Sequence, residues 1–180
     1  MKVLLFEGID KVGKTTTIKT LEDNLKEKGY KVIKIELPFT CNKISIEERA
    51  FRLEMTVNNI IEIDKYFNDD NTICLVDRLY LSEKVYGAVL RNGNFDNFKC
   101  NLFDYKISQL DTVLIHVKPL NPLHNFNKFK DENGLIDGLT YQQYLDTYNA
   151  FVEEVSKSAI YKKVEITTDK LKNIEKILCL

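Results

Sequence analysis

The sequence predicts a doubly wound α/β protein with a mainly five-stranded parallel sheet and helices on both faces. Short apolar runs typical of buried strands alternate with longer segments that carry helical spacing. The 180 residues, 44% of them hydrophobic, are enough for one domain with a full core. Strands separated by helices along a short chain pack as a parallel sheet covered on both sides. We therefore expect a single domain over residues 1–180.

Three strands and two helices are expected in the first half of the chain. The first helix has an apolar stripe and stops at Gly29, which suits a C-terminal cap. The second helix opens on Ser45 and Glu48, which have the spacing of a capping box. The strands are the apolar runs before, between and after these helices. In chain order, the five elements are expected at residues 3–6, 14–29, 31–37, about 45–67, and 72–77.

The second half is expected to add two strands, at residues 111–117 and 163–167. A helix begins at the capping pair Thr140 and Gln143 and runs through the segment YLDTYNAFVEEV. The stretch over residues 119–138 is polar, weakly patterned and longer than ordinary connections, so we expect a lid there. A terminal amphipathic helix is indicated by Leu171, Ile174 and Ile177.

The segment between the first strand and the first helix has the form GxxxxGK[ST], which marks a phosphate-binding loop. Its glycines let the backbone turn so that N–H groups and the helix N-terminus point at phosphate oxygens. Lys14 is expected at the β- and γ-phosphates of ATP, and the Thr15 hydroxyl on Mg²⁺. The residues expected to bind ATP are Gly8, Ile9, Asp10, Lys11, Val12, Gly13, Lys14, Thr15 and Thr16.

The third strand is expected to end at Asp77, followed by Arg78, at the edge of the sheet where the phosphate-binding loop lies. Asp77 is expected to organise Mg²⁺ and its waters, and Arg78 to clamp a phosphate. The base-reading NKxD motif of GTPases does not appear, because Asn42 opens NKIS and Asn127 opens NKFK. The pattern therefore favours a small P-loop kinase over a GTPase.

The composition of the chain argues against several other kinds of protein and of site. A net charge of −1 with interspersed signs argues against broad nucleic-acid binding. The two histidines and four cysteines, without a CxxC pair, favour reduced thiols in the cytoplasm over a zinc site or a disulfide framework. No apolar run approaches the length of a membrane span, and the opening MKVLLFEG is too short for a signal peptide. The expected partners are small nucleotides, without nucleic acid or membrane.

Four segments spread over nearly the whole chain resemble the thymidylate kinase family. They are FEGIDKVGKTT, VDRLYLSEKVYG, DENGLIDGLTYQQYLDTY and VEITTDKLKNIEKI, which suit that family's P-loop, DR motif, lid with following helix, and adenine-side loop. The resemblance implies ATP-dependent phosphorylation of a deoxynucleoside monophosphate, dTMP to dTDP first, for deoxynucleotide supply. It also implies Mg²⁺ as a cofactor and a homodimer.

The resemblance also bears on which cation stabilises the transferred phosphoryl group. Some family members have a basic residue at the position of Lys11 and a lid poor in arginine. This chain has no arginine after Arg91, and Lys128 and Lys130 are the only basic residues of the lid segment. Lys11 is therefore expected to act in catalysis together with Lys14 and Arg78. A lysine can serve, because a loose transition state needs mainly positioning and positive charge.

On the acceptor side, the resemblance assigns the acceptor's phosphate to Arg78 and the sugar 3′-hydroxyl to Asp10. In the helix after Arg78, three- and four-residue spacing puts Ser82, Glu83 and Tyr86 on one side, facing the acceptor base. Tyr86 is expected to exclude a ribose 2′-hydroxyl. The Glu83 carboxylate accepts hydrogen bonds, so it favours a base edge that carries a donor.

Two arginines common in the family are missing, one after Pro38, where the chain reads ELPFTCNK, and one on the long helix, where it reads MTVNN. Arg52 is expected to substitute for them at the acceptor, with Arg49 and Lys43 as alternatives. Phe39 is expected to stack on or pack against the base.

With fewer arginines for the acceptor phosphate, a nucleoside acceptor stays open. In deoxynucleoside kinases, which have a related fold, a carboxylate takes the 5′-hydroxyl proton, and Glu36 or Asp77 could do so here. Against this, those enzymes usually have a P-loop of the form EGNIxxGK, without the aspartate found at Asp10. A non-catalytic module that binds nucleotides is the further alternative.

Overall fold

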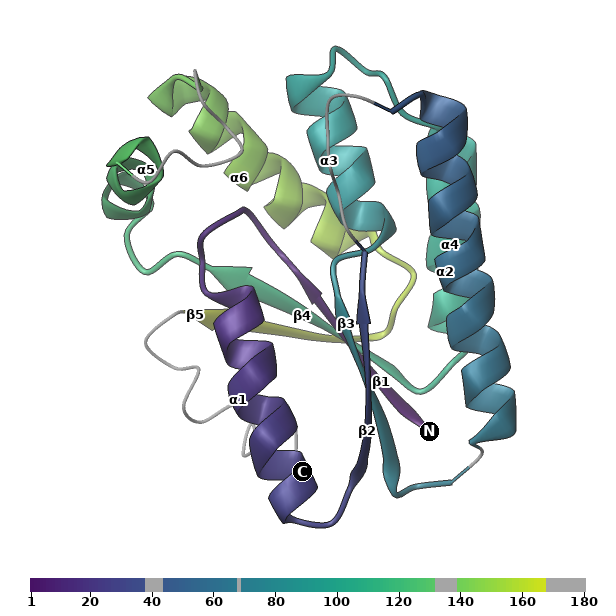
Figure 1. Ribbon diagram of the computed structural model, residues 1–180. Coiled ribbons are helices and arrows are strands. Elements are labelled where there is room, and N and C mark those ends of the chain that lie inside the picture. The colour runs from purple at the N-terminus through teal and green to yellow at the C-terminus, as the bar shows by residue number, and fades with distance from the viewer. Residues whose placement is uncertain (38–43, 68, 132–138, 168–180) are drawn as a thin grey trace.

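The computed structural model describes residues 1–37, 44–67, 69–131 and 139–167 of the chain (Figure 1). A five-stranded sheet forms its centre, and every adjacent pair of strands is parallel. The strand order is β2-β3-β1-β4-β5, so after β1 the chain goes to the edge strand β2, returns to β3, and then crosses to β4 and β5 on the other side of β1. The expected fold class is thus confirmed. The strands are β1 (Lys2–Glu7), β2 (Lys31–Glu36), β3 (Thr72–Asp77), β4 (Thr112–Lys118) and β5 (Lys162–Thr167).

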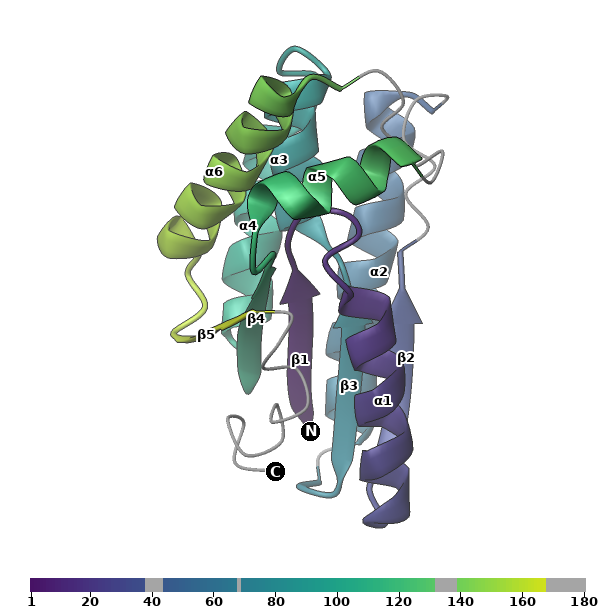
Figure 2. The same ribbon diagram turned by 90° about the vertical axis from the view of Figure 1, so that its left-hand side faces the viewer.

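Helices cover both faces of the sheet. Helix α1 packs on one face, and α2 and α4 pack on the other (Figure 1). Helices α3, α5 and α6 lie toward the carboxyl ends of the strands, and α5 crosses above the loop between β1 and α1 (Figure 2). The helices are α1 (Lys14–Glu27), α2 (Ile46–Tyr66), α3 (Tyr80–Leu90), α4 (Asn97–Ser108), α5 (Pro122–Asp131) and α6 (Tyr141–Lys157).

The core is divided by the sheet into two layers. Along β1, Leu4 and Phe6 face the layer that contains α1, whereas Val3 and Leu5 face the layer that contains α2 and α4. This alternation follows from the two-residue period of a strand. Because both faces are covered, the strand is apolar at every one of these positions, which is why it appeared in the sequence as a continuous run.

The two expected helix caps differ in completeness. The Ser45 hydroxyl accepts a hydrogen bond from the Glu48 N–H at 3.1 Å, but the Glu48 carboxylate pairs with Arg52 one turn on. Only the serine half of that capping box is therefore formed. At α6, Thr140 and Gln143 form both bonds of the box.

Two helices of the structure were not among the expected elements. Helix α4 has buried Cys100, Phe103 and Ile107, but its outer side also carries large apolar residues, so its sequence has little contrast between two faces. Helix α5 lies inside the segment expected to be a lid. Residues 132–138 of that segment, Phe39 and the expected terminal helix lie outside the described residues. No helix among the described residues is long and apolar enough to cross a membrane.

Candidate active site

The loop after β1 passes so close to β4 that only glycine fits at its start. Gly8 has φ +140°, and a Cβ atom there would lie 2.4 Å from the backbone oxygen of Val117. Gly13, at φ 82°, is the residue that caps α1. The N-terminal N–H groups of α1 are thereby turned toward the loop, where an anion is favoured. Ile9 and Val12 are buried in the core, so only their backbone is available to a phosphate.

Lys14 lies inside this loop. Its side chain is 4% exposed, and Nζ donates to the carbonyl oxygens of Gly8 at 2.8 Å and Ile9 at 2.7 Å. Burial lowers the pKa of Lys14 to about 8, although the charges of Asp77 and Glu7 oppose this shift. The ammonium group is therefore held at the centre of the loop by carbonyl oxygens, which a phosphate could replace.

Thr15 and Asp77 join the P-loop to the end of β3. The Thr15 hydroxyl donates to Asp77 Oδ2 at 2.8 Å. The other carboxylate oxygen, Oδ1, is buried and has no hydrogen-bond partner among the described residues. Mg²⁺ prefers oxygen ligands and is usually held by one or two carboxylates together with substrate phosphates. A hydroxyl beside a carboxylate with an unused oxygen fits such an ion.

Lys11 is exposed and takes the left-handed backbone conformation, with φ 60°. Thr16, on the first turn of α1, is exposed as well. The roles assigned to these two residues stay predictions.

Arg78 contacts three other residues that are expected at the acceptor. Its own φ is 69°, and its N–H donates to the carbonyl of Phe6 at 3.0 Å. One guanidinium nitrogen, Nη2, forms an ion pair with Asp10. The other, Nη1, donates to the Ser82 hydroxyl at 3.1 Å, and the guanidinium carbon lies 5.5 Å from the centre of the Tyr86 ring. Asp10, Arg78, Ser82 and Tyr86 thus form one cluster beside the P-loop.

Glu7 belongs to the same cluster and was missed in the sequence. It is fully buried, and its Oε1 accepts from the Leu79 N–H at 2.8 Å. Its Oε2 accepts from the Ser82 hydroxyl at 2.5 Å. Burial raises the pKa of Glu7, against the effects of Ser82 and Arg78. The available signal was a carboxylate at the carboxyl end of a buried strand, which apolar packing does not explain.

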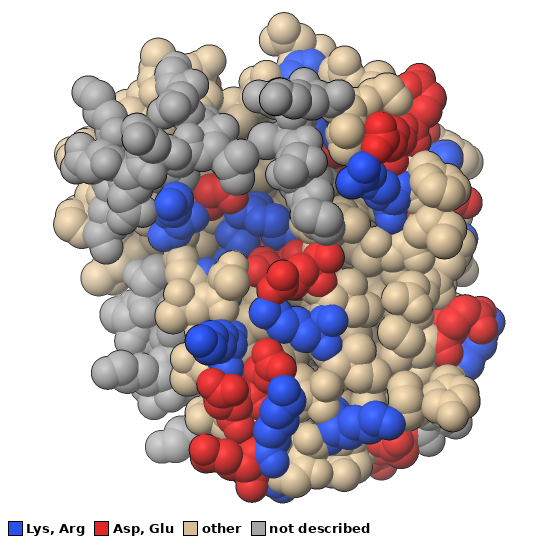
Figure 3. Space-filling view, viewed as in Figure 1, with Lys and Arg blue, Asp and Glu red and all other residues tan. Residues whose placement is uncertain are grey.

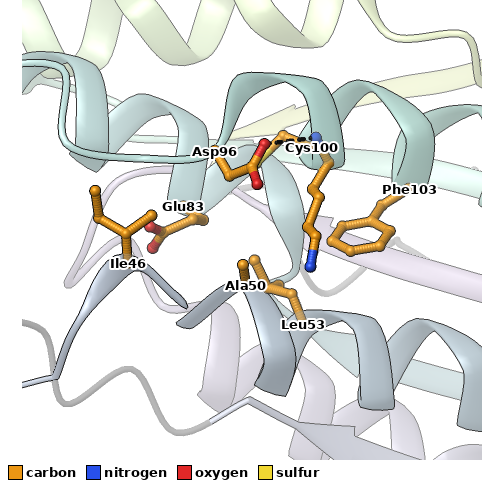
Figure 4. A pocket seen from close by; sticks show the side chains of 8 residues that line it. Ile46, Ala50, Leu53, Glu83, Asp96, Cys100 and Phe103 are labelled. Atoms are coloured by element: carbon orange, nitrogen blue, oxygen red, sulfur yellow. Dashed lines mark hydrogen bonds between the residues drawn. The ribbon is translucent and has the colours of Figure 1, made fainter. Parts of the chain in front are cut away.

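Glu83 already forms ion pairs with two arginines of the protein. It is 3% exposed, and its carboxylate lies 2.9 Å from Arg49 Nε and 2.8 Å from Arg91 Nη2. In Figure 4 it lines a small hollow between α2, α3 and α4, together with residues that include Ile46, Ala50 and Cys100. A contact from Glu83 to an acceptor base therefore stays a prediction, and it would compete with two arginines.

Arg52 lies on an exposed part of α2, where it pairs with Glu48 at 2.5 Å. The buried arginine of this helix is Arg49, one turn closer to its start. Basic and acidic side chains are interspersed over the face of the molecule in Figure 3. The acceptor roles of Arg52 and Phe39 stay predictions.

Comparison with known proteins connects this site to a family. No protein-family model matches the sequence. The thymidylate kinase of Caldicellulosiruptor saccharolyticus is 29% identical over 180 residues, which cover 90% of this chain and 85% of that protein. The chain is a thymidylate kinase relative. A probable thymidylate kinase of Sulfurisphaera tokodaii is 32% identical over 96 residues, or 49% of this chain and 50% of that protein.

Solved structures agree with this relationship at the level of the fold. The thymidylate kinase of Ehrlichia chaffeensis has a TM-score of 0.64 at 18% identity, covering 98% of both chains. The YorR protein of Bacillus subtilis, solved in complex with phosphorylated GDP, has a TM-score of 0.64 at 17% identity, covering 99% of this chain and 96% of its own. Both likenesses support the P-loop kinase fold.

The thymidylate kinase relationship confirms the resemblance seen in the four sequence segments. It also confirms the expected enzyme class, a phosphotransferase of the thymidylate kinase-like, nucleoside monophosphate kinase type.

Proposed function

We propose that this chain transfers the γ-phosphoryl group of ATP to a deoxynucleoside monophosphate, with dTMP as the first choice and dTDP and ADP as products. The observation that carries the proposal is the position of Arg78, whose guanidinium lies beside the P-loop and is held by Asp10 and Ser82. A guanidinium recognises phosphate through paired N–H donors, which suits an acceptor that already has a phosphate.

On the donor side, the P-loop N–H groups and Lys14 bind the phosphates of ATP. Lys14 Nζ exchanges the carbonyl oxygens of Gly8 and Ile9 for the β- and γ-phosphate oxygens. Thr15 and Asp77 would hold Mg²⁺, which neutralises charge on the phosphates. Lys11 is placed by sequence in the same loop and supplies positive charge to the transferred group.

On the acceptor side, Arg78 binds the monophosphate and Asp10 the sugar 3′-hydroxyl. Without an acceptor these two residues are paired with each other, so binding exchanges their contact for contacts to the substrate. An oxygen of the acceptor phosphate then attacks the γ-phosphorus, and the bond from that phosphorus to the β–γ bridging oxygen breaks. Tyr86 packs at the Arg78 guanidinium and is close enough to limit the size of the sugar.

A nucleoside acceptor would need a carboxylate to take a proton from its 5′-hydroxyl. Of the two candidates, Asp77 accepts a hydrogen bond from Thr15, and Glu36 forms an ion pair with Lys34. Asp77 and Glu36 are partners in the β2–β3 register, so both stand at the carboxyl edge of the sheet. The acceptor screen described next separates this alternative from the proposed function.

The test is an ADP-release screen of all deoxynucleosides and deoxynucleoside monophosphates, with the product identified by chromatography and Lys14→Ala as the inactive control. We expect turnover with dTMP. Phosphorylation of thymidine or deoxycytidine with dTMP inert would replace the proposal by a deoxynucleoside kinase. ATP binding without turnover on any acceptor would indicate the non-catalytic module.

We also propose that residues 119–138 act as the lid. Its helix α5 contacts the P-loop through Asn125, whose side-chain amide lies 3.4 Å from the carbonyl oxygen of Asp10. The same amide donates to the Tyr144 hydroxyl of α6 at 2.9 Å. A movement of α5 would therefore change the contact of Asn125 with Asp10, which is assigned to the acceptor.

The remaining parts of the proposal are a homodimer and a cytoplasmic location. Free, buried Cys74 and Cys100 are compatible with a reducing compartment. Support for a dimer comes from α2 and α4, which adjoin through an ion pair between Glu54 and Lys99 at 3.1 Å. These helices expose six large apolar side chains: Phe51, Met55, Tyr66, Phe98, Leu102 and Tyr105. Exposed apolar surface of this kind favours a protein partner.

A further inference from the structure

Glu7 is a buried carboxylate to which the proposed function gives no role. Its side chain is 0% exposed, although it lies one residue before the first glycine of the P-loop. A carboxylate in such a place needs donors around it. Three are present, all from the turn and first residues of α3: the Leu79 N–H at 2.8 Å, the Ser82 hydroxyl at 2.5 Å and the Ser82 N–H at 3.4 Å.

The bond from Ser82 to Glu7 fixes the direction of the next one. A serine hydroxyl has one proton to donate and two lone pairs to accept with. The Ser82 hydroxyl donates to Glu7 Oε2, so its proton points at that carboxylate oxygen. The Ser82 oxygen then presents a lone pair to Arg78 Nη1, which lies 3.1 Å away. The two hydrogen bonds therefore run in one direction, from the Arg78 guanidinium to Ser82 and from Ser82 to Glu7.

Glu7 also holds the backbone on which Arg78 is mounted. Arg78 has φ 69°, which an L-residue adopts only where its surroundings require it. Leu79, the next residue, donates its N–H to Glu7 Oε1, and Arg78 donates its own to the carbonyl of Phe6. The end of β1 therefore fixes both the main chain and one side of the guanidinium of Arg78.

We propose that Glu7 is a positioning residue for the acceptor, acting through Ser82 on Arg78. This inference rests on the proposed function, in which Arg78 binds the acceptor phosphate. Asp10 holds Nη2 and releases it when the phosphate binds, whereas Ser82 holds Nη1 together with the Gly8 carbonyl oxygen at 3.2 Å and the Tyr86 hydroxyl at 3.4 Å. Glu7 thus pre-organises the guanidinium for a phosphate, and its loss should affect the acceptor more than ATP.

The first variant is Glu7→Gln, which keeps the size of the side chain. In one orientation of the amide, its NH₂ faces the Ser82 hydroxyl, so the Ser82 proton loses the acceptor that Glu7 Oε2 provides. In the other orientation, the NH₂ faces the Leu79 N–H, a donor against a donor. Each orientation therefore disrupts one of the contacts that Glu7 accepts. We expect KM for dTMP, or for the monophosphate that the acceptor screen selects, to rise at least about tenfold. KM for ATP should change by a smaller factor, because the charge of Glu7 also acts on Lys14.

The second variant, Ser82→Ala, removes the intermediate hydroxyl, and with it one donor to Glu7, and it should raise KM for the monophosphate by a similar factor. In a double-mutant cycle, Glu7→Gln should add a smaller factor in the Ser82→Ala background than in wild type, because only the contact to Leu79 is then left to lose. Glu62→Gln, on an exposed turn of α2, is the control and should behave as wild type. Circular dichroism of each variant monitors the fold.

The outcomes separate this inference from the proposed function. Unchanged KM for the monophosphate in Arg78→Ala would remove the acceptor role of Arg78, and the inference with it. A raised KM in Arg78→Ala, combined with wild-type behaviour of either Glu7→Gln or Ser82→Ala, would overturn the inference alone. Independent, multiplicative effects of Glu7→Gln and Ser82→Ala would do the same. If Glu7→Gln does not fold, the Ser82→Ala result decides.

Discussion

At the scale of single residues, the proposed function gives Lys11 and Lys14 of the same loop different roles. Lys14 is buried and its Nζ donates to two carbonyl oxygens, whereas Lys11 is exposed. We expect Lys11→Ala to bind ATP almost normally but to turn over at least about tenfold slower, because a contact made only in the transition state has been removed. Steady-state kinetics with varied ATP measures both constants. An unchanged kcat would leave Lys128 and Lys130 as the candidates.

Arg78→Ala tests the acceptor site directly. A lost bidentate contact between arginine and phosphate should cost about 2–4 kcal/mol, so kcat/KM for the monophosphate should fall by about 30- to 1000-fold. Turnover of a nucleoside, if any occurs, should fall less. Arg52→Ala is measured beside it, because Arg52 is the other arginine expected at the acceptor, although it is exposed and pairs with Glu48. A loss in Arg52→Ala as large as in Arg78→Ala would show that the acceptor is held from α2.

At the scale of secondary-structure elements, the close passage of the P-loop over β4 depends on one glycine. In Gly8→Ala the new Cβ meets the Val117 backbone oxygen, so the loop must shift, and φ +140° is unfavourable for any L-residue. We expect ATP binding, measured by calorimetry, to weaken at least about tenfold. Gly29→Ala is the control, because Gly29 also has positive φ but nothing within 4 Å of its Cβ position. It should cost about 1 kcal/mol of stability with normal ATP affinity. Equal ATP affinity in the two variants would contradict the steric argument.

The secondary-structure elements differ in how well the sequence predicts them. Elements with one clear signal were predicted well, such as the apolar run that became β3 and the complete cap of α6 by Thr140 and Gln143. The P-loop was found because a local motif carries its own geometry. Helix α4 was not predicted because large apolar residues on its exposed side, such as Phe98 and Tyr105, interrupt the polar half of the helical pattern. Contacts between distant segments, such as Glu7 with Ser82, require the strand register and have no local signature.

At the scale of the whole molecule, His116 links the stability of the sheet to pH. It lies in β4, 1% exposed, with its ring 6.3 Å from that of Phe151, and its ring nitrogens have no hydrogen-bond partner among the described residues. Burial and the charge of Lys118 lower its pKa to about 4, although Glu165 acts in the opposite direction. The unfolded chain therefore binds a proton on this residue below about pH 6.5, before the folded protein does.

This difference should make the protein less stable as the pH falls from 6.5 to 4, by about 2–4 kcal/mol from His116 alone. Above pH 6.5 the contribution is fully present. Urea unfolding of wild type and His116→Leu at several pH values measures it, and the variant should lose that part of the slope. His124→Leu is the control, because His124 is exposed on α5. Parallel pH profiles for wild type and His116→Leu would assign the acid sensitivity to other groups.

We expect the exposed apolar side chains of α2 and α4 to form the interface of the proposed dimer. A stable dimer buries about 800 Å² of each partner, with apolar and aromatic side chains at its centre. Placing a charge there should be costly, because it would be desolvated without a partner. We expect the wild type to be a dimer by light scattering after size exclusion, and Phe98→Glu to be a monomer. Tyr161→Glu, at a tyrosine that is 96% exposed just before β5, should stay a dimer. A monomeric wild type would reject the dimer, whereas a dimeric Phe98→Glu would move the interface away from α4.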